Sequence, residues 1–422
     1  MRSRLYRHAD FRRLWAGQTI SQFGSQVTTL ALPLVAVLAL HASAFRVSLL
    51  GMFGILPYLV FALPAGAWVD RVARRPVLIG ADAGRAFALG SVPLAAAVAH
   101  VTFVQLCVVG FVAGTLTVFF DVAYQSYLPS LVEQDDLVDA NSKLEVSRSG
   151  AQIGGPGLAG LLVQWLGAPY AVAVDAVSFA WSALFLQRIR AQETVEPPPE
   201  MRNMRREIGE GLRYLLRDER WRATTMFSAV FNFAGGITGP LILVYAVRRW
   251  GLGAGQLGLA FMLGNIGWLV GALVAGRTAR VVGLGRALVV GGAISGSPFL
   301  VVPLLPKEHA LPGLVAVQAI WELGLLIYNV NAISLYQTQV PARMLGRVSA
   351  SRRWIVFGVI SLGNLLGGIF ASQVGLRSAL ILGASVSLVS FTPLLSPAIR
   401  TLTTVYGDAR ASGEARVAMP AE

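Results

Sequence analysis

The chain has 422 residues, of which 55% are hydrophobic and 14% are charged, and its mean hydropathy is +0.62. Soluble domains cannot bury so much apolar surface, so the composition predicts a protein with many membrane-spanning segments. The net charge of +13 comes from short basic clusters between apolar runs, which are typical of topology signals and not of a nucleic-acid-binding surface. The single cysteine, Cys107, and four scattered histidines give no disulfide or metal-ligand spacing, so we expect no metal and no cofactor.

Twelve runs of about 20 mostly apolar residues predict transmembrane helices. A basic N-terminal stretch leads directly into the first run, which we therefore expect to remain as a helix and not to be cleaved as a signal peptide. The runs lie at residues 14–40, 47–69, 77–99, 102–125, 145–166, 169–188, 223–247, 254–275, 285–305, 311–333, 354–371 and 377–398.

The basic residues predict the orientation of these spans. With twelve spans, 29 of the 35 lysines and arginines fall on the side that carries both termini. Positively charged loops are retained in the cytoplasm, so we expect both termini and the long central loop there. Arginine outnumbers lysine 33 to 2, which is typical of a GC-rich bacterial genome, and the predicted location is a bacterial inner membrane.

The central loop divides the chain into two halves of six spans. It holds a proline-rich break, "EPPPE", followed by a basic amphipathic stretch that predicts a helix on the membrane surface. Residues 7–23 align without gaps on 217–233, and 126–146 on 334–354, which indicates an internal duplication. We predict an N-terminal six-helix bundle (1–190), a cytoplasmic linker with an amphipathic helix (191–222), a C-terminal six-helix bundle (223–400) and a cytoplasmic tail (401–422).

The stretch "GAWVDRVARRP" follows the second predicted span. One interpretation is a topology signal whose arginines hold anionic lipid head groups. The stretch also resembles the signature of the major facilitator superfamily, a glycine, an Asp-Arg pair and a basic pair after span 2. The resemblance implies an all-α membrane fold of two pseudo-symmetric six-helix bundles, and a conformational latch formed by Gly66, Asp70, Arg71, Arg74 and Arg75. The second half has only a degenerate copy, with Arg280 in place of the aspartate, so we expect a one-sided latch.

A second motif, "SGAQIGGPGLAG", opens the fifth span. Small residues let membrane helices approach closely and proline can bend them, so tight packing alone would explain it. The motif also resembles the span-5 antiporter motif of efflux members of the superfamily, carried here by Gly150, Gly154, Gly155, Pro156 and Gly160. Further stretches, such as "FFDVAYQSYLPSLV", resemble the drug-efflux branch that includes macrolide and siderophore exporters. Unlike many drug/proton antiporters, the chain has no arginine in span 4, so coupling through such an arginine is not expected.

Five ionisable residues within the spans are candidates for proton or cation coupling, because each charge there costs at least about 2.5 kcal/mol at the bilayer centre. Asp82 and Arg85 lie three residues apart and can form a structural ion pair. Asp121 is either hydrated near the inner end of span 4 or paired with Arg85, and Asp175 in span 6 fits a polar contact equally well. Glu322 is the leading candidate, because it lies near the middle of span 10 with no basic residue within a turn.

The candidate substrate cavity combines polar and aromatic side chains. Gln18, Gln22 and Gln26 follow one face of span 1, where they bind either a ligand or a neighbouring helix. Spans 1, 4, 7 and 10 line the cavity in the superfamily, which implies a mixed lining suited to an amphipathic molecule. The other candidates are Phe23, Phe119, Phe231, Asn232, Trp321, Tyr328 and Asn329.

Together these features predict a monomeric secondary transporter, not an enzyme, that exports amphipathic drugs or secondary metabolites by alternating access. Its expected partners are a small-molecule substrate, protons and membrane lipids, and no nucleic acid. An importer or a lipid or lysolipid flippase of the same fold is the alternative. A membrane-embedded enzyme is the remote one, since the chain shows no nucleophile–base pair, acid cluster or ATP-binding loop.

Overall fold

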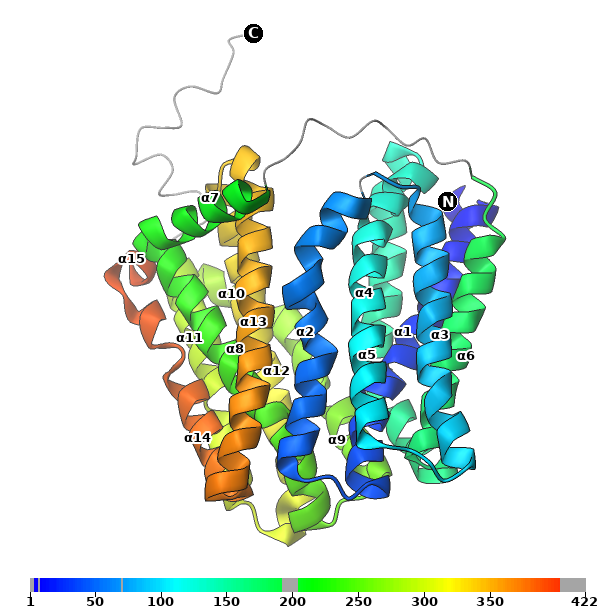
Figure 1. Ribbon diagram of the computed structural model, residues 1–422. Helices are drawn as coiled ribbons and strands as arrows, with labels where there is room; N and C mark the ends of the chain where they lie inside the picture. The colour runs from blue at the N-terminus through cyan, green and yellow to red at the C-terminus, as the bar shows by residue number, and fades with distance from the viewer. Residues whose placement is uncertain (1–3, 7, 70, 192–203, 403–422) are drawn as a thin grey trace.

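The computed structural model describes residues 4–6, 8–69, 71–191 and 204–402, and within these ranges it is helical with no β-strand. Most helices run nearly parallel in two groups, and both chain ends lie at the same face, here called the terminal face (Figure 1). The N-terminal bundle consists of α1 (Ala9–Leu34), α2 (Ala44–Val69), α3 (Arg74–Ala97), α4 (Phe103–Leu131), α5 (Leu137–Leu166) and α6 (Ala168–Gln187).

The C-terminal bundle contains α8 (Glu219–Tyr245), α9 (Ala254–Gly264), α10 (Ile266–Val282), α11 (Leu284–Gly296), α12 (Ala310–Gln339), α13 (Ala342–Val374) and α14 (Leu376–Val389). α9 and α10 together form one span that is interrupted at Asn265. The short α15 (Pro397–Arg400) follows at the terminal face. The predicted all-α fold of two six-helix bundles is confirmed.

Eleven helical stretches among the described residues are long and apolar enough to cross a membrane. The twelfth predicted span, α5, is not one of them, because its first half carries Asp139, Lys143, Glu145 and Arg148 and its second half is rich in glycine. It nevertheless packs against α1 and α6 of its own bundle and against α9 of the other bundle. Tertiary contacts, not apolar composition alone, therefore stabilise this span.

α7 (Met204–Arg217) lies across the terminal face of the C-terminal bundle (Figure 1). It packs closely on α13, where Gly211 faces the backbone of Arg347 and the side chain of Ser351. An ion pair between Glu210 and Arg347 joins the same two helices. The predicted linker helix is thus attached to the C-terminal bundle, whereas linker residues 192–203 and tail residues 403–422 lie outside the described residues.

The internal duplication is visible in local backbone geometry. Gly167 and Gly375, 208 residues apart, have φ of 85° and 88°, and each immediately precedes a helix, α6 and α14. Only glycine adopts this conformation without strain, so each position permits a tight helix-to-helix turn. π-helical segments also end the first span of each half, at Val35–Ala39 and Ala246–Trp250. The spacing of the glycines equals the offset of 208 in the second aligned pair, and that of the π-helical segments is within one residue of the offset of 210 in the first.

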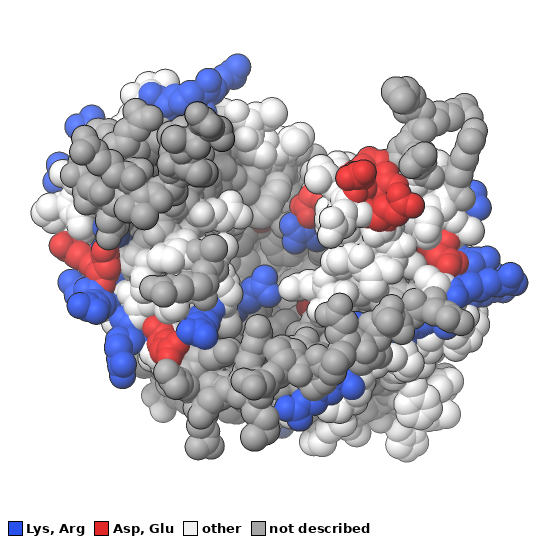
Figure 2. Space-filling model, turned by 90° about the horizontal axis from the view of Figure 1, so that it is seen from above, with Lys and Arg blue, Asp and Glu red and all other residues white. Residues whose placement is uncertain are grey.

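The bundles are joined at the face opposite the termini and separate toward the terminal face. One cluster of buried apolar residues near the opposite face crosses both bundles, including Leu34 and Val163 from one half and Leu241 and Leu257 from the other. Toward the terminal face, each bundle has a core cluster of its own. The terminal face is hollowed between the two lobes (Figure 2). We call the other face the closed face.

Candidate functional site

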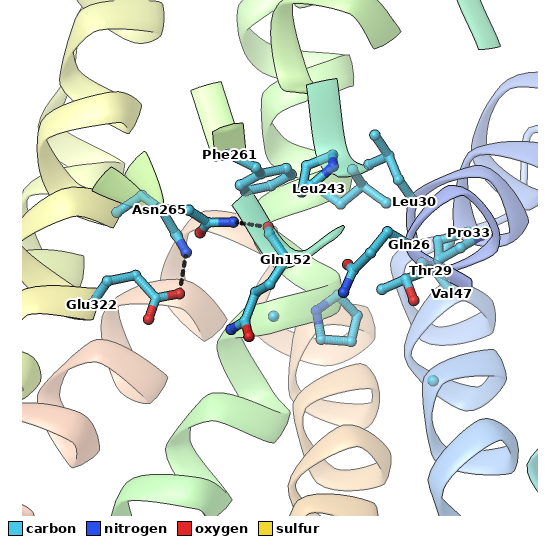
Figure 3. Close-up of a pocket in the computed structure, with 15 residues that line it drawn as sticks. Gln26, Thr29, Leu30, Pro33, Val47, Gln152, Leu243, Phe261, Asn265 and Glu322 are labelled. Carbon is cyan, nitrogen blue, oxygen red and sulfur yellow. Dashed lines mark hydrogen bonds between the residues drawn. The ribbon is translucent and has the colours of Figure 1, made fainter. Parts of the chain in front are cut away.

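A cavity of about 390 Å³ lies between the two bundles. Its polar side chains come from α1, α5, the α9–α10 break and α12, so both halves of the chain contribute (Figure 3). Among the described residues that line it, Glu322 is the one charged residue. The lining consists of Gln26, Thr29, Leu30, Pro33, Val47, Gly51, Gln152, Pro156, Gly239, Pro240, Leu243, Phe261, Asn265, Gln318 and Glu322.

The Glu322 carboxyl is buried, with 6% of the residue exposed. Gln318, one helical turn earlier on α12, donates a hydrogen bond from Nε2 to Oε1 at 3.3 Å. Among the described residues the other carboxylate oxygen, Oε2, has no hydrogen-bond partner. A carboxylate in this surrounding is destabilised by the loss of water and by the absence of a cation in the described lining, so binding a proton or a cation relieves it.

A second cavity, of about 690 Å³, lies between α2, α4, α5 and α13 on the terminal-face side. Asp121 lines it and accepts a hydrogen bond from the Tyr58 hydroxyl at 3.0 Å. The Tyr58 ring stacks on Phe357 of the other bundle, with ring centroids 4.4 Å apart. Arg148 and the exposed Arg353 also line this cavity. Asp121 thus lies in this second cavity, here called the vestibule, and the hydrogen bond that it accepts comes from Tyr58 and not from Arg85.

Asp82 and Arg85 form the ion pair that their spacing predicts. Both are buried, with 0% and 4% exposed, and the guanidinium lies between the rings of Phe120 and Phe179, at 4.4 and 4.0 Å from their centroids. Neither residue lines the two cavities above. The geometry favours the structural interpretation, since the two charges compensate each other inside the N-terminal bundle.

Asp175 also lies inside the N-terminal bundle, 1% exposed, where α6 packs on α1. Its Oδ1 accepts a hydrogen bond from the Ser178 hydroxyl at 3.0 Å. A Cβ atom on Gly24 of α1 would lie only 2.5 Å from Asp175 Oδ1. The carboxyl is therefore bonded within its own helix and packed against α1, which favours a structural role over a role in transport.

The three glutamines on one face of span 1 line two different pockets. Gln26 and Thr29 line the central cavity, whereas Gln18 and Gln22 line a separate pocket of about 150 Å³ beside Tyr124 and Ser147. Phe23 packs near Gly154 of α5. Phe119 lies in an apolar groove formed by α2, α3 and α4, with its ring 5.5 Å from that of Trp68.

The remaining cavity candidates are in the C-terminal bundle, and none of them lines either of the two cavities. Tyr328 is 2% exposed and contacts Phe227, while its hydroxyl donates to the Thr224 carbonyl at 3.2 Å. The rings of Phe231 and Trp321 stack 6.4 Å apart. Asn232 donates to the Ser228 carbonyl of its own helix, and Asn329 is half-buried on α12.

The predicted latch lies at the terminal face, between α2 and α3. Gly66 is in the last turns of α2, Arg71 is exposed and Arg74 is half-buried, while Asp70 lies outside the described residues. Arg75 donates hydrogen bonds to the carbonyls of Leu186 and Gln187 at 3.0 and 2.6 Å, at the C-terminal end of α6. This position favours a cation, and these two bonds remain within the N-terminal bundle.

The span-5 motif lies where α5 crosses α9 of the other bundle. A Cβ atom on Gly160 would be 2.6 Å from the Ala254 carbonyl oxygen and 2.8 Å from Gly258 Cα, so only glycine permits this approach. Gly155 faces Gln26, Gly154 faces Phe23, and Gly150 faces open space. Arg248 also joins the two bundles at the closed face, where it donates hydrogen bonds to the carbonyls of His41 and Ala42 at 3.2 and 2.6 Å. The motif therefore contributes to the contact that closes this face.

Several residues that line these cavities were not among the sequence candidates. Gln318 could have been found from its spacing of four residues from Glu322, which places both on one face of the helix. Gln152 and Asn265 are polar residues within apolar runs, but their common location depends on contacts between distant helices. The same holds for Tyr58 and Arg353, which line the vestibule from opposite bundles.

The family model of the Major Facilitator Superfamily matches residues 14–363. The chain belongs to this superfamily of membrane transporters. It is 29% identical over 394 residues to the multidrug efflux pump Tap of Mycolicibacterium fortuitum, which covers 90% of this chain and 93% of the relative. It is 22% identical over 387 residues to macrolide efflux protein A of Streptococcus pyogenes, with 89% of this chain and 92% of the relative covered.

A solved transporter shows the same fold. A bacterial homologue of the iron transporter ferroportin, in an inward-facing state, matches with a TM-score of 0.69 and 17% identity, covering 91% of this chain and 98% of that one. At this identity the likeness establishes the architecture alone. The protein is thus a multi-pass transporter of the Major Facilitator Superfamily, and its substrate and coupling ion have to be argued from its own residues.

Proposed function

We propose that the protein is a proton-coupled exporter of amphipathic, drug-like molecules, and that Glu322 is its proton site. The observation that carries the proposal is the buried Glu322 carboxyl, which faces a cavity between the bundles and has no cation among the described lining residues. The names of the two curated relatives, a multidrug and a macrolide efflux pump, support the direction of transport.

The cavity lining indicates the kind of substrate. Amides and a hydroxyl from Gln26, Thr29, Gln152, Asn265 and Gln318 can donate and accept hydrogen bonds, and the rest of the lining is mostly apolar. One carboxyl with no compensating cation favours protonatable amines and organic cations over anions. A proton and a cationic substrate would then occupy the Glu322 region in alternation, which is the requirement for exchange.

The orientation of the proposed exporter follows from the basic residues. Because 29 of 35 lie on the side of the termini, the terminal face is cytoplasmic, and the hollow seen there opens to the cytoplasm. The described conformation then admits substrate from inside the cell. We place the transporter in a bacterial inner membrane as a monomer.

Alternating access requires the closed face to separate and the terminal face to join. The α5–α9 crossing at Gly160 would open, while the stretch that follows α2 would contact the other bundle. In this proposal Asp70, Arg71, Arg74 and Arg75 form the latch of the state open to the outside.

Asp70→Asn is therefore expected to impair transport without changing topology. Efflux assays together with labelling of both termini measure this. Full activity of Asp70→Asn would leave this stretch as a topology signal only.

An importer, or a flippase for lipids or lysolipids, is the second candidate, since both can use the same fold. Purified protein in proteoliposomes separates the possibilities when dyes, macrolides and lysolipids are followed under an imposed proton gradient. We expect uphill movement of cationic dyes or macrolides coupled to proton movement in the opposite direction. Movement of lysolipids alone, or transport in the same direction as protons, would contradict the proposal.

A susceptibility panel tests the same function in cells. It compares a strain lacking the gene with strains that carry the wild type or Glu322→Gln. We expect the wild type, and not Glu322→Gln, to raise resistance to cationic amphipathic drugs, with equal amounts of protein in the membrane. Equal resistance from both proteins would exclude Glu322 as the proton site.

A further inference from the structure

One hydrogen bond crosses the interface between the bundles beside a proline of α5. Asn265 is 7% exposed and its Nδ2 donates to the main-chain carbonyl of Gln152 at 2.6 Å (Figure 3). Asn265 belongs to the C-terminal bundle and Gln152 to α5 of the N-terminal bundle. The bond therefore crosses the interface that must open during transport.

The acceptor carbonyl is one that a regular helix would satisfy internally. The carbonyl of Gln152 would accept from the backbone N–H of the residue four positions later, and that residue is Pro156, which has no N–H. In the interior of a membrane a carbonyl without its helical donor is costly unless another group satisfies it. Asn265 supplies the missing donor from the opposite bundle.

The donor is held in place by an interruption of its own span. α9 ends at Gly264 and α10 begins at Ile266, and Asn265 lies between them with φ −66° and ψ −9°. Gly264 and Gly267, on either side of this break, allow it to pack closely against α12. A Cβ atom on Gly264 would lie 2.4 Å from Gln318 Cγ, and one on Gly267 would lie 2.0 Å from the Ala319 carbonyl oxygen. The position of Asn265 is therefore fixed by α12, the helix that carries Glu322.

We propose that Asn265 is a positioning residue that holds the closed face shut by capping the carbonyl which Pro156 leaves without a helical donor. The bond must break when α5 separates from α9, and both of its partners line the central cavity, where water or a polar substrate can replace them. This inference rests on the proposed transport function and extends it. A ligand in the cavity acts on the closed face through the Asn265–Gln152 bond as well as through Glu322.

The test measures the conformational equilibrium of the full chain in nanodiscs. Spin labels are attached at His100→Cys and Lys307→Cys, with Cys107→Ala as the background. These two exposed positions lie in the α3–α4 and α11–α12 connections, one in each bundle. We expect Asn265→Ala to raise the ratio of open to closed populations at the closed face by about three- to tenfold, the effect of losing one such hydrogen bond in a membrane protein. Asn331→Ala is the matched control, because among the described residues this buried amide donates to the carbonyls of Ile327 and Ala275, both in its own bundle.

A double-mutant cycle with Pro156→Ala separates the proposed role from a merely structural one. Alanine restores the backbone N–H for Gln152, so Asn265→Ala should change the equilibrium much less in the Pro156→Ala background than in the wild type. An equal effect of Asn265→Ala in both backgrounds, or no effect in the wild type, would overturn the proposal. If Asn265→Ala is not recovered as folded protein, Asn265→Ser, whose hydroxyl is too short to make the same bond, takes its place in the cycle.

Proton release on adding tetraphenylphosphonium, a cationic probe, distinguishes this inference from the proposed function. If Glu322→Gln still releases protons while Asn265→Ala opens the closed face, the proton-site assignment fails and the role of Asn265 stands. If Glu322→Gln abolishes proton release and the cycle shows no coupling between Asn265 and Pro156, the proton-site assignment stands and the proposed role of Asn265 fails.

Discussion

Glu322 and Asp82 are both buried carboxyls in membrane-spanning helices, with 6% and 0% of the residue exposed, yet their surroundings differ in kind. Asp82 is paired with Arg85 inside the N-terminal bundle, and two aromatic rings enclose the guanidinium. Glu322 lies at the interface of the bundles, has an amide as its hydrogen-bond donor and faces a cavity. Burial alone therefore does not identify a coupling site.

The difference lies in what can compensate each charge. At Asp82 the compensating cation belongs to the same helix and remains there throughout any movement of the bundles. At Glu322 no described lining residue is a cation, so in the proposed mechanism the compensating group comes from outside the protein, as a proton or a cationic substrate, and can leave again. A carboxyl at a moving interface can thus couple binding to conformational change, whereas one within a rigid bundle contributes to stability.

The largest expected effect on transport comes from Glu322→Gln. The amide keeps the size of the side chain but cannot release a proton, so uphill export in proteoliposomes should fall about tenfold or more. Glu308→Gln, which alters an exposed carboxyl in the connection before α12, serves as the control and should retain activity. Unimpaired proton-driven export by Glu322→Gln would remove the distinction between the two carboxyls.

Asp82→Asn should act mainly on stability. It leaves Arg85 as an uncompensated buried charge, and removing one partner of such a pair costs about 3 kcal/mol or more. We expect a lower yield and a lower midpoint of thermal unfolding in detergent, with normal transport per folded molecule. Adding Arg85→Met should restore part of the stability. Loss of proton coupling in well-folded Asp82→Asn would instead place this pair in the transport pathway.

Asp121→Asn should have an intermediate effect. This carboxyl lines the vestibule, but Tyr58 donates to it and the arginines Arg148 and Arg353 line the same cavity. Loss of the negative charge should weaken substrate entry, raising the KM for export about threefold and leaving the maximal rate nearly unchanged. Tyr58→Phe should show a smaller change in the same direction. A loss of coupling as large as that of Glu322→Gln would make Asp121 a second proton site.

Asp175→Asn should have the smallest overall effect, with little loss of stability and with transport within about twofold of wild type, because the side chain bonds to Ser178 and faces α1 instead of a cavity. Initial rates of dye export at equal protein amounts measure this directly. A stronger loss of transport than that of Asp121→Asn would show that the α1–α6 contact moves during the cycle.

The sequence determined the features that depend on local pattern. Apolar runs of sufficient length and the clustering of arginines between them predicted the all-α membrane fold, because charge and unpaired backbone are costly in lipid. The similarity of the halves at a fixed offset predicted two bundles, because a duplicated sequence folds twice into the same unit. The spacing of Asp82 and Arg85 likewise predicted their ion pair, since residues three apart share a helical face.

The tertiary structure decided which polar residues meet. Gln26 reaches the central cavity while Gln18 and Gln22 line another pocket, and Tyr328 lies inside its own bundle, although all were equally plausible from the sequence. The bond from Asn265 to the carbonyl left by Pro156 joins residues 113 positions apart. Such contacts depend on how distant helices are rotated and packed, and neither hydropathy nor helical periodicity specifies that.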